Sequence, residues 1–196
     1  IYMELDSVED IIKSNQDSIV IVDEAYIDFG GQSAVKLIGK YDNLLVVQTY
    51  SKSRSMAGMR IGYAMGNERL IKALNDVKFS VNSYTMNATS LAYGAASMKD
   101  VDYFNETVNK IISTRTRSEE RLRELGFTFP ESKANFIFAS HRSVPASVIF
   151  EELKKRNIYV RYFNKPRIDN YLRITVGTDE QMDKLFEALA EITGDR

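Results

Sequence analysis

The stretch SIVIVDEAY, residues 18–26, indicates a buried strand that ends at a polar site. Its residues 19–22 form a continuous β-branched run, which is typical of a strand covered on both faces. Asp23 and Glu24 end this run abruptly. Because ligands of open α/β sheets bind beyond the carboxyl ends of parallel strands, we expect Asp23 and Tyr26 to face a crevice. A carboxylate in this position is expected to be poorly solvated and to need a cationic partner.

A second stretch, NLLVVQTYSK, has the same organisation. Its apolar residues 44–47 predict a neighbouring strand, which ends close to Ser51 and Lys52. We therefore expect Ser51 and Lys52 to face the same crevice as the polar residues that follow the first strand. Lys52 is a potential amine nucleophile, and its reactivity increases when a nearby cation lowers its pKa.

Two arginines follow Lys52 in a short polar loop, at positions 54 and 60. Together with Ser51, these arginines are suited to hold a phosphate through charge-assisted hydrogen bonds. An acid, a reactive amine and a phosphate clamp are the groups that pyridoxal phosphate (PLP) requires of a protein. The residues alone thus point to a PLP site that contains Asp23, Lys52 and Arg60.

The rest of the chain alternates between helical and strand patterns. Two domains are expected, an α/β domain over residues 1–100 and, over residues 101–196, a long helix followed by a smaller α+β domain. The patterns predict helices over 6–16, 67–80, 85–98, 101–125, 145–156 and 179–192. Further strands are predicted over 59–66, 135–139, 158–163 and 171–176.

Composition excludes several classes of function. The 196 residues hold 26 Lys+Arg and 27 Asp+Glu, a net charge of −1, so we expect no nucleic-acid partner that needs a basic surface. The chain has no cysteine, which excludes thiolate catalysis and cysteine-ligated metals, and its only histidine is His141. With no cysteine and a single histidine, we expect no metal site. We also expect no membrane span, because no apolar run approaches about 20 residues. A cytoplasmic location is the resulting expectation.

Three segments carry a family resemblance. VDEAYIDF (22–29), TYSKSRSMAGMRIGY (49–63) and YLRITVGT (171–178), with VRYF (160–163), resemble segments of histidinol-phosphate aminotransferases. These belong to the fold-type I, aspartate-aminotransferase-like PLP enzymes. The resemblance implies the C-terminal part of the large PLP-binding α/β domain, with a mainly parallel sheet, followed by the small α+β domain. It also implies amino transfer between histidinol phosphate and 2-oxoglutarate, with glutamate as the amino donor, in histidine biosynthesis.

The same resemblance implies a role for each matching residue. Lys52 is similar to the lysine that binds PLP as a Schiff base and moves a proton between substrate and cofactor. Asp23 resembles the partner of the pyridinium nitrogen, and Tyr26 the tyrosine that bonds the phenolic oxygen. Ser51 and Arg60 match phosphate-binding positions.

Two arginines match the substrate-binding positions of the family. Arg173 is similar to the small-domain arginine that binds the acidic group of the substrate. Arg161 is similar to a second arginine near the substrate phosphate. Two arginines suit this reaction chemically, since glutamate offers a carboxylate and histidinol phosphate offers a phosphate.

The chain departs from the family at its N-terminal side. Family members are much longer there, and the missing part holds a phosphate-binding turn, a ring-stacking aromatic and an asparagine that bonds the phenolic oxygen. Ile1 is not a methionine, so we expect an upstream segment and little activity of this chain alone. The family is also homodimeric. Alternative functions are an aromatic aminotransferase, a threonine-phosphate decarboxylase, or a catalytically silent interaction module.

Each site residue also has a purely structural interpretation. Lys52 is then a surface lysine, Asp23 a turn cap and Tyr26 a packing residue with a satisfied hydroxyl. Arg60 is then a structural ion pair, and Arg173 an edge-strand residue whose stem covers apolar surface. The structure has to distinguish between these interpretations.

Overall fold

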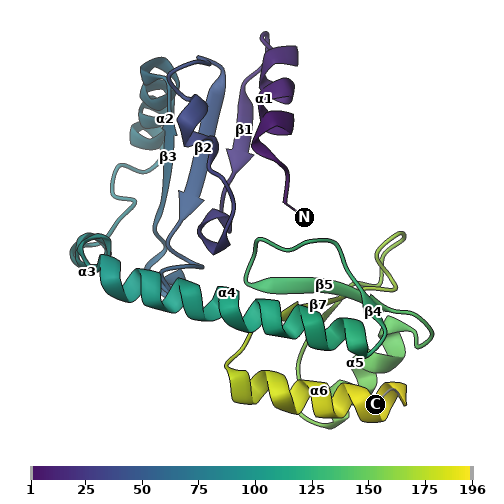
Figure 1. The fold of residues 1–196 in the computed structure, drawn as a ribbon. Coiled ribbons are helices and arrows are strands. Elements are labelled where there is room, and N and C mark those ends of the chain that lie inside the picture. Colours follow the sequence, from purple (N-terminus) through teal and green to yellow (C-terminus); the bar gives the residue numbers. More distant parts are fainter. Residues whose placement is uncertain (1, 195–196) are drawn as a thin grey trace. The chain divides into compact units, whose positions relative to one another are not determined.

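The computed structural model describes residues 2–194, which form two compact units (Figure 1). The first unit comprises residues 2–107 and the second begins at residue 108. The division falls within the helix α4 (Val101–Glu124), which continues from one unit into the other. Each unit is described by itself.

The first unit contains a three-stranded mixed sheet in the order β1-β2-β3. Strands β1 (Val20–Asp23) and β2 (Leu44–Thr49) pair in parallel, as the positions of their polar ends predict. Strand β3 (Gly62–Gly66) pairs with β2 in the antiparallel direction, whereas the sequence predicted a mainly parallel sheet. The connection between the two strands contains only the 3-10 helix Ala57–Met59 and no α-helix that could cross a face of the sheet, so the chain returns in the antiparallel direction.

One face of this sheet is covered by the helix α1 (Leu5–Ser14) and the 3-10 helix η2 (Ala34–Leu37). The buried members of this core are Val8, Ile12, Ala34, Leu37, Leu44 and Val46. On β1, Val20 and Val22 pack against this core, whereas Ile21 is 61% exposed. The prediction that β1 is covered on both faces is therefore wrong for the described residues, since α1 and η2 cover one face only.

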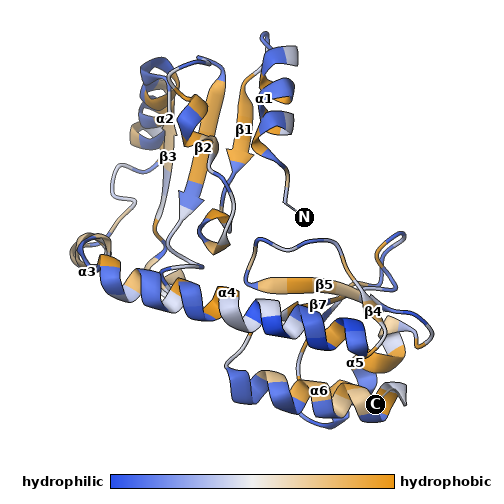
Figure 2. Ribbon diagram, in the orientation of Figure 1, coloured by the Kyte–Doolittle hydropathy of each residue, from blue (hydrophilic) through white to orange (hydrophobic). Residues whose placement is uncertain are grey.

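Four further helical elements belong to this unit. They are the 3-10 helices η1 (Ile27–Phe29) and η3 (Ala57–Met59), and the helices α2 (Glu68–Val81) and α3 (Ala88–Lys99). The side chain of Asn67 caps α2, and that of Asn87 caps α3. Figure 2 shows that α2 carries both hydrophobic and hydrophilic residues. No residue of α2 is buried, and its expected apolar positions Leu74 and Val77 are 44% and 63% exposed. The three 3-10 helices were not predicted.

The second unit is an antiparallel sheet in the order β4-β5-β7-β6. Its strands are β4 (Phe127–Thr128), β5 (Phe136–His141), β6 (Arg161–Tyr162) and β7 (Leu172–Thr175). Its helices are α5 (Ala146–Lys155) and α6 (Asp179–Thr193). The sequence predicted each of these elements except the two-residue β4. Thr178 caps α6 through a capping box with Gln181.

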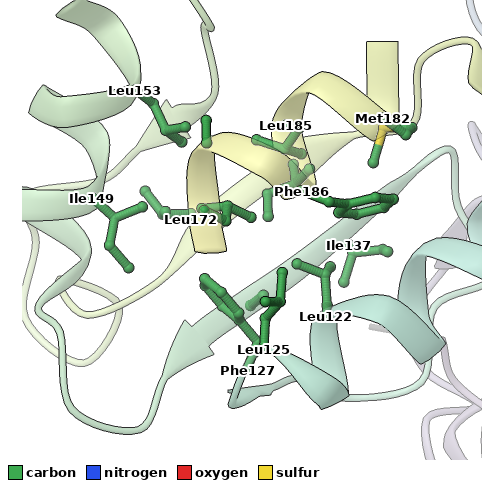
Figure 3. Close-up of a cluster of buried hydrophobic side chains, with 14 of the residues drawn as sticks. Leu122, Leu125, Phe127, Ile137, Ile149, Leu153, Leu172, Met182, Leu185 and Phe186 are labelled. Carbon is green, nitrogen blue, oxygen red and sulfur yellow. The ribbon is translucent and has the colours of Figure 1, made fainter. Parts of the chain in front are cut away.

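A single apolar core joins the sheet of this unit to its helices. Figure 3 shows side chains from α4, β5, β7, α5 and α6 meeting in this core. Leu122, Ile137, Ile149, Leu153 and Leu172 are all 0% exposed. Since Ile137 and Leu172 point to this face, the alternate residues of β5 and β7 point to the opposite face. That opposite face carries the arginine Arg173.

None of the helices within residues 2–194 combines the length and the hydrophobicity that crossing a bilayer requires.

We predict that Ile137→Ala lowers the free energy of unfolding by about 2–5 kcal/mol, because the substitution leaves a cavity in a closed core. Urea unfolding followed by circular dichroism measures this change. Val148→Ala, at a position that is 47% exposed on α5, is the control and should cost less than about 0.5 kcal/mol. Equal losses in the two variants would contradict the assigned core.

Glu9 on α1 predicts an acid-dependent contribution to stability. Hydrogen bonds from Lys40 and then from Tyr41 lower the pKa of Glu9 from 4.5 to about 2. A pKa that is lower in the folded state adds stability above the ordinary value, and this stability is lost as the pH falls toward 2. Glu9→Gln should therefore destabilise the chain at neutral pH, and the difference from the unmodified chain should shrink between pH 4.5 and about 2.

Thermal unfolding over this pH range measures the effect. Asp17→Asn removes an exposed carboxylate from the turn that follows α1 and serves as the control for lost negative charge. A difference between Glu9→Gln and the unmodified chain that stays constant down to pH 2 would refute the assigned pairing.

Candidate active site

The carboxyl ends of β1 and β2 lie side by side. Asp23 pairs in register with Val47, and the backbone N–H of Glu24 donates to the Val47 carbonyl at 2.8 Å. The Asp23 carboxylate accepts a hydrogen bond from the N–H of Ala25 at 3.0 Å. Asp23 is exposed, so the expectation of a poorly solvated carboxylate is wrong. Asp23 shares the open face of β1 with Ile21, which explains its exposure.

Lys52 lies against Tyr26, which follows β1. The Lys52 Nζ is 5.4 Å from the centre of the Tyr26 ring, and both residues are half-buried. This distance is within the range of a cation–π interaction. No carboxylate of the described residues forms an ion pair with Lys52. The structure thus joins the two predicted residues and leaves the amine without a neutralising anion.

Ser51 and Arg60 occupy equivalent places on the two sides of the β2–β3 connection. Thr49 pairs with Gly62, and the Tyr50 N–H donates to the Ile61 carbonyl at 3.1 Å, which preserves this register. Along the chain, Ser51 and Arg60 are the next residues beyond this pair. The Ser51 hydroxyl oxygen is 2.9 Å from the Thr49 hydroxyl. The two positions that were assigned to phosphate thus follow the last bonded pair of β2 and β3, one on each side of the connection.

Arg60 has an unusual backbone conformation. Its φ of 56° lies in the left-handed region, which is costly for a residue that has a Cβ atom. The exposed guanidinium donates to the Ala57 carbonyl at 3.1 Å. Such strain concentrates at functional sites, and here it accompanies the arginine assigned to phosphate.

Arg54 does not join this group as the sequence suggested. Its guanidinium donates to the Ser97 carbonyl at 2.7 Å and lies 4.2 Å from the centre of the Phe104 ring. The ring of Tyr50 is 5.4 Å away. Arg54 thus connects the loop to α3 and to the first turn of α4, where its guanidinium contacts the Ser97 carbonyl and the Phe104 ring. The sequence could not show this, because Ser97 lies more than 40 positions away.

Glu24 is a residue of this site whose role the sequence did not predict. It is 6% exposed, and its carboxylate accepts from Gln48 at 2.7 Å, from Ser33 at 2.7 Å and from the N–H of Ala34 at 2.6 Å. These bonds join the end of β1 to β2 and to the start of η2. The signal in the sequence is an acidic residue directly after an apolar strand, which Glu24 shares with Asp23.

The two predicted substrate arginines are cross-strand neighbours in the second unit. Arg161 on β6 pairs in register with Arg173 on β7, so the two side chains lie on the same face of the sheet. The Arg161 guanidinium lies 5.4 Å from the centre of the Phe163 ring, and that of Arg173 lies 5.3 Å from the Phe136 ring. Like charges directly opposite each other destabilise a sheet, and a bound anion would relieve this cost.

Arg173 has an unused hydrogen-bond donor. Its Nε atom is buried and has no hydrogen-bond partner in the described part of the chain. Beside it, Phe138 stacks on Tyr171 with the ring centres 4.7 Å apart and an interplanar angle of 10°. A buried donor without a partner costs free energy. The arrangement favours an acidic ligand over the edge-strand interpretation of Arg173.

The site residues supply two sets of chemical groups. The first unit offers an amine, a carboxylate, a phenol, a hydroxyl and a guanidinium, from Lys52, Asp23, Tyr26, Ser51 and Arg60. The second unit offers two paired guanidinium groups. Among the described residues, no group of three or more acidic or histidine side chains is placed to hold a metal ion.

Comparison with known proteins gives a consistent result. The family described as aminotransferase class I and II matches residues 1–189. A histidinol-phosphate aminotransferase of Brachyspira hyodysenteriae is 53% identical over 189 residues, which cover 96% of this chain and 53% of that protein. One from Clostridium acetobutylicum is 52% identical and covers 97% of this chain and 54% of its own. The chain thus spans about half the length of the curated relatives it matches.

Solved structures share the fold. The structure of a histidinol-phosphate aminotransferase from Sinorhizobium meliloti, in complex with pyridoxal-5'-phosphate, has a TM-score of 0.86 at 23% identity. That match covers 98% of this chain and 54% of the other. Because the family match extends over nearly the whole sequence, the chain belongs to the class I and II aminotransferases.

Proposed function

We propose that the protein is a PLP-dependent aminotransferase that acts on histidinol phosphate and 2-oxoglutarate in histidine biosynthesis. The observation that carries this proposal is the Lys52 amine, which lies 5.4 Å from the Tyr26 ring, next to the joint ends of β1 and β2. Relatives with this name are 52–53% identical to the chain over 189–190 aligned residues. We also propose a cytoplasmic homodimer as the active form, as the family resemblance implies.

The residues at the ends of β1 and β2 fit the needs of PLP. When bound, PLP supplies an aldehyde that takes up an amine and a protonated ring that withdraws electrons. Lys52 offers an amine without an ion pair in the described structure, and Asp23 offers an exposed carboxylate from the adjacent strand. Ser51 and Arg60, which follow the same β2–β3 register, offer a hydroxyl and a guanidinium to the phosphate.

Each side chain then has a defined task. The Asp23 carboxylate would keep a proton on the ring nitrogen of PLP, because an adjacent negative charge favours the cationic form. The Tyr26 hydroxyl would offer a hydrogen bond to the phenolic oxygen of the ring. The Lys52 amine would hold the aldehyde end of PLP and would accept and return the proton of the substrate α-carbon.

In the second unit, Arg161 and Arg173 bind the acidic groups of the substrates. Glutamate presents a second carboxylate and histidinol phosphate presents a phosphate, and a guanidinium can form two parallel hydrogen bonds with either group. The buried Nε of Arg173 would gain the partner that it lacks.

We predict that PLP labels Lys52 of this chain. Incubation with PLP, reduction with borohydride and peptide mass spectrometry should locate the adduct at Lys52, because this amine has no ion pair within the described residues. Lys52→Ala should remove the label, and Lys99→Ala, at the exposed end of α3, should retain it. Labels distributed evenly over the surface lysines would argue against the proposed function.

We predict that Arg173→Gln lowers kcat/KM for both glutamate and histidinol phosphate by about 10- to 100-fold, the equivalent of one charge-assisted hydrogen bond. Steady-state kinetics in a catalytically active form of the protein measures this loss. Arg69→Ala, at an exposed position on α2, is the control. An unchanged kcat/KM for Arg173→Gln would exclude Arg173 from the substrate site.

The same kinetic assay separates the competing reactions. Formation of a keto acid without release of carbon dioxide supports amino transfer. Release of carbon dioxide without a keto acid would identify a decarboxylase and overturn the assigned reaction. A preference for aromatic amino acids over histidinol phosphate would overturn the assigned substrate.

A further inference from the structure

We propose that Asp28 and Ser53 form a positioning pair that holds Lys52 against Tyr26. This inference rests on the proposed role of Lys52. The sequence motifs predict no role for either residue, and the proposed PLP chemistry does not require the side chain of either one. Their importance follows from their places in the chain, because Asp28 lies two residues after Tyr26 and Ser53 directly follows Lys52.

The two residues connect the loop after β1 to the loop after β2. The Ser53 hydroxyl donates to the Asp28 carboxylate at 2.5 Å. Ser53 is 4% exposed, whereas Asp28 is an exposed residue, so the hydrogen bond runs from a buried hydroxyl to a carboxylate near the surface, and the neighbouring Lys52 is half-buried. A hydrogen bond to an ionised acceptor is about twice as strong as a neutral one. Its geometry ties the backbone at Lys52 to the segment that carries Tyr26.

Each loop is also closed internally. In the first loop, the N–H of Phe29 donates to the Tyr26 carbonyl at 3.2 Å, and Phe29 is 0% exposed. In the second, the N–H of Ser55 donates to the Lys52 carbonyl at 3.1 Å. Both segments are therefore short, hydrogen-bonded turns, and the bond between Asp28 and Ser53 joins one turn to the other.

A lysine needs such support more than most residues. Its long side chain has many rotamers, and ordering it costs about 1.5–2 kcal/mol of entropy. A reactive group has to be held within about 0.5 Å of its productive position. The cation–π contact with Tyr26 at 5.4 Å directs the amine, but it can do so only if the two backbones keep their spacing. The bond between Asp28 and Ser53 fixes that spacing.

The same loop offers a matched control. Ser90 on α3 is 2% exposed, and its hydroxyl donates to the Met59 carbonyl at 2.8 Å. Like Ser53, Ser90 is a buried serine whose hydroxyl joins the Lys52–Arg60 region to another segment, since Ser53 bonds Asp28 and Ser90 bonds Met59. Its bond is at the far end of the loop, so Ser90→Ala tests the loss of a buried serine bond without touching the pair.

The test measures the reactivity of Lys52 in the cofactor-free chain. Acetic anhydride acylates amines, and peptide mass spectrometry gives the rate constant at Lys52 over a range of pH. Ser53→Ala and Asp28→Ala should each raise this rate about tenfold, because the amine leaves its half-buried position. Ser90→Ala should leave the rate and its pH profile unchanged. Asp28→Asn, which retains an acceptor oxygen without the charge, should raise the rate by less than Asp28→Ala does, because a neutral acceptor forms a weaker hydrogen bond than a carboxylate.

Two further comparisons make the outcome decisive. The double variant of Asp28→Ala with Ser53→Ala should react as fast as either single variant, because both remove one bond. Effects that add up in the double variant would overturn the proposal, as would an unchanged rate in Ser53→Ala. An equal effect of Ser90→Ala, or equal effects of Asp28→Asn and Asp28→Ala, would also overturn it, by assigning the change to loop stability or to charge.

The proposed function fails in a different way. If neither the unmodified chain nor the full-length protein forms an adduct between PLP and Lys52, the function is wrong, whatever the acylation rates are. If the unmodified chain forms the adduct, the positioning pair further predicts that Ser53→Ala captures PLP about tenfold more slowly, since a misplaced reactive group loses rate. Capture at the unmodified rate would overturn the positioning pair and leave the function intact.

Discussion

The parallel pairing of β1 with β2 is the interaction on which the candidate site depends. It places Asp23 beside Val47 and thereby brings the ends of two strands that are separated by 20 residues to one edge of the sheet. Backbone hydrogen bonds, such as that from Glu24 to Val47 at 2.8 Å, hold this register. A shift by one residue would turn Asp23 to the opposite face, because side chains alternate along a strand. The buried Glu24, which bonds Gln48 on β2, opposes such a shift.

A comparable constraint of register operates in the second unit. The pairing of β6 with β7 sets Arg161 opposite Arg173, and the apolar core on the other face of the sheet fixes which side these arginines occupy. The stability of the core thus offsets the repulsion between two like charges. Aromatic rings beside both guanidinium groups stabilise the positive charge further. Unfavourable interactions such as this repulsion between neighbouring arginines are typical of ligand sites.

The sequence predicted the elements that have long, regular patterns and missed those that depend on distant partners. The helix α6 could be predicted, because Thr178 caps it and an apolar stripe continues through it. The strand β4 has two residues, and it exists only through its pairing with β5. The exposure of Asp23 and the hydrogen bond from Arg54 to the Ser97 carbonyl also depend on tertiary contacts. Likewise, the chemistry of the site residues was visible in the motifs, whereas the pairing of Arg161 with Arg173 required the strand register.

The most direct measurement is a crystal structure of the protein with PLP. The account predicts continuous electron density from the Lys52 Nζ to the aldehyde carbon of PLP. It also predicts the Asp23 carboxylate within about 2.6–3.2 Å of the ring nitrogen, a hydrogen-bonding distance. A PLP ring bound elsewhere, with the Lys52 amine in solvent and the Asp23 carboxylate away from the ring, would contradict the account.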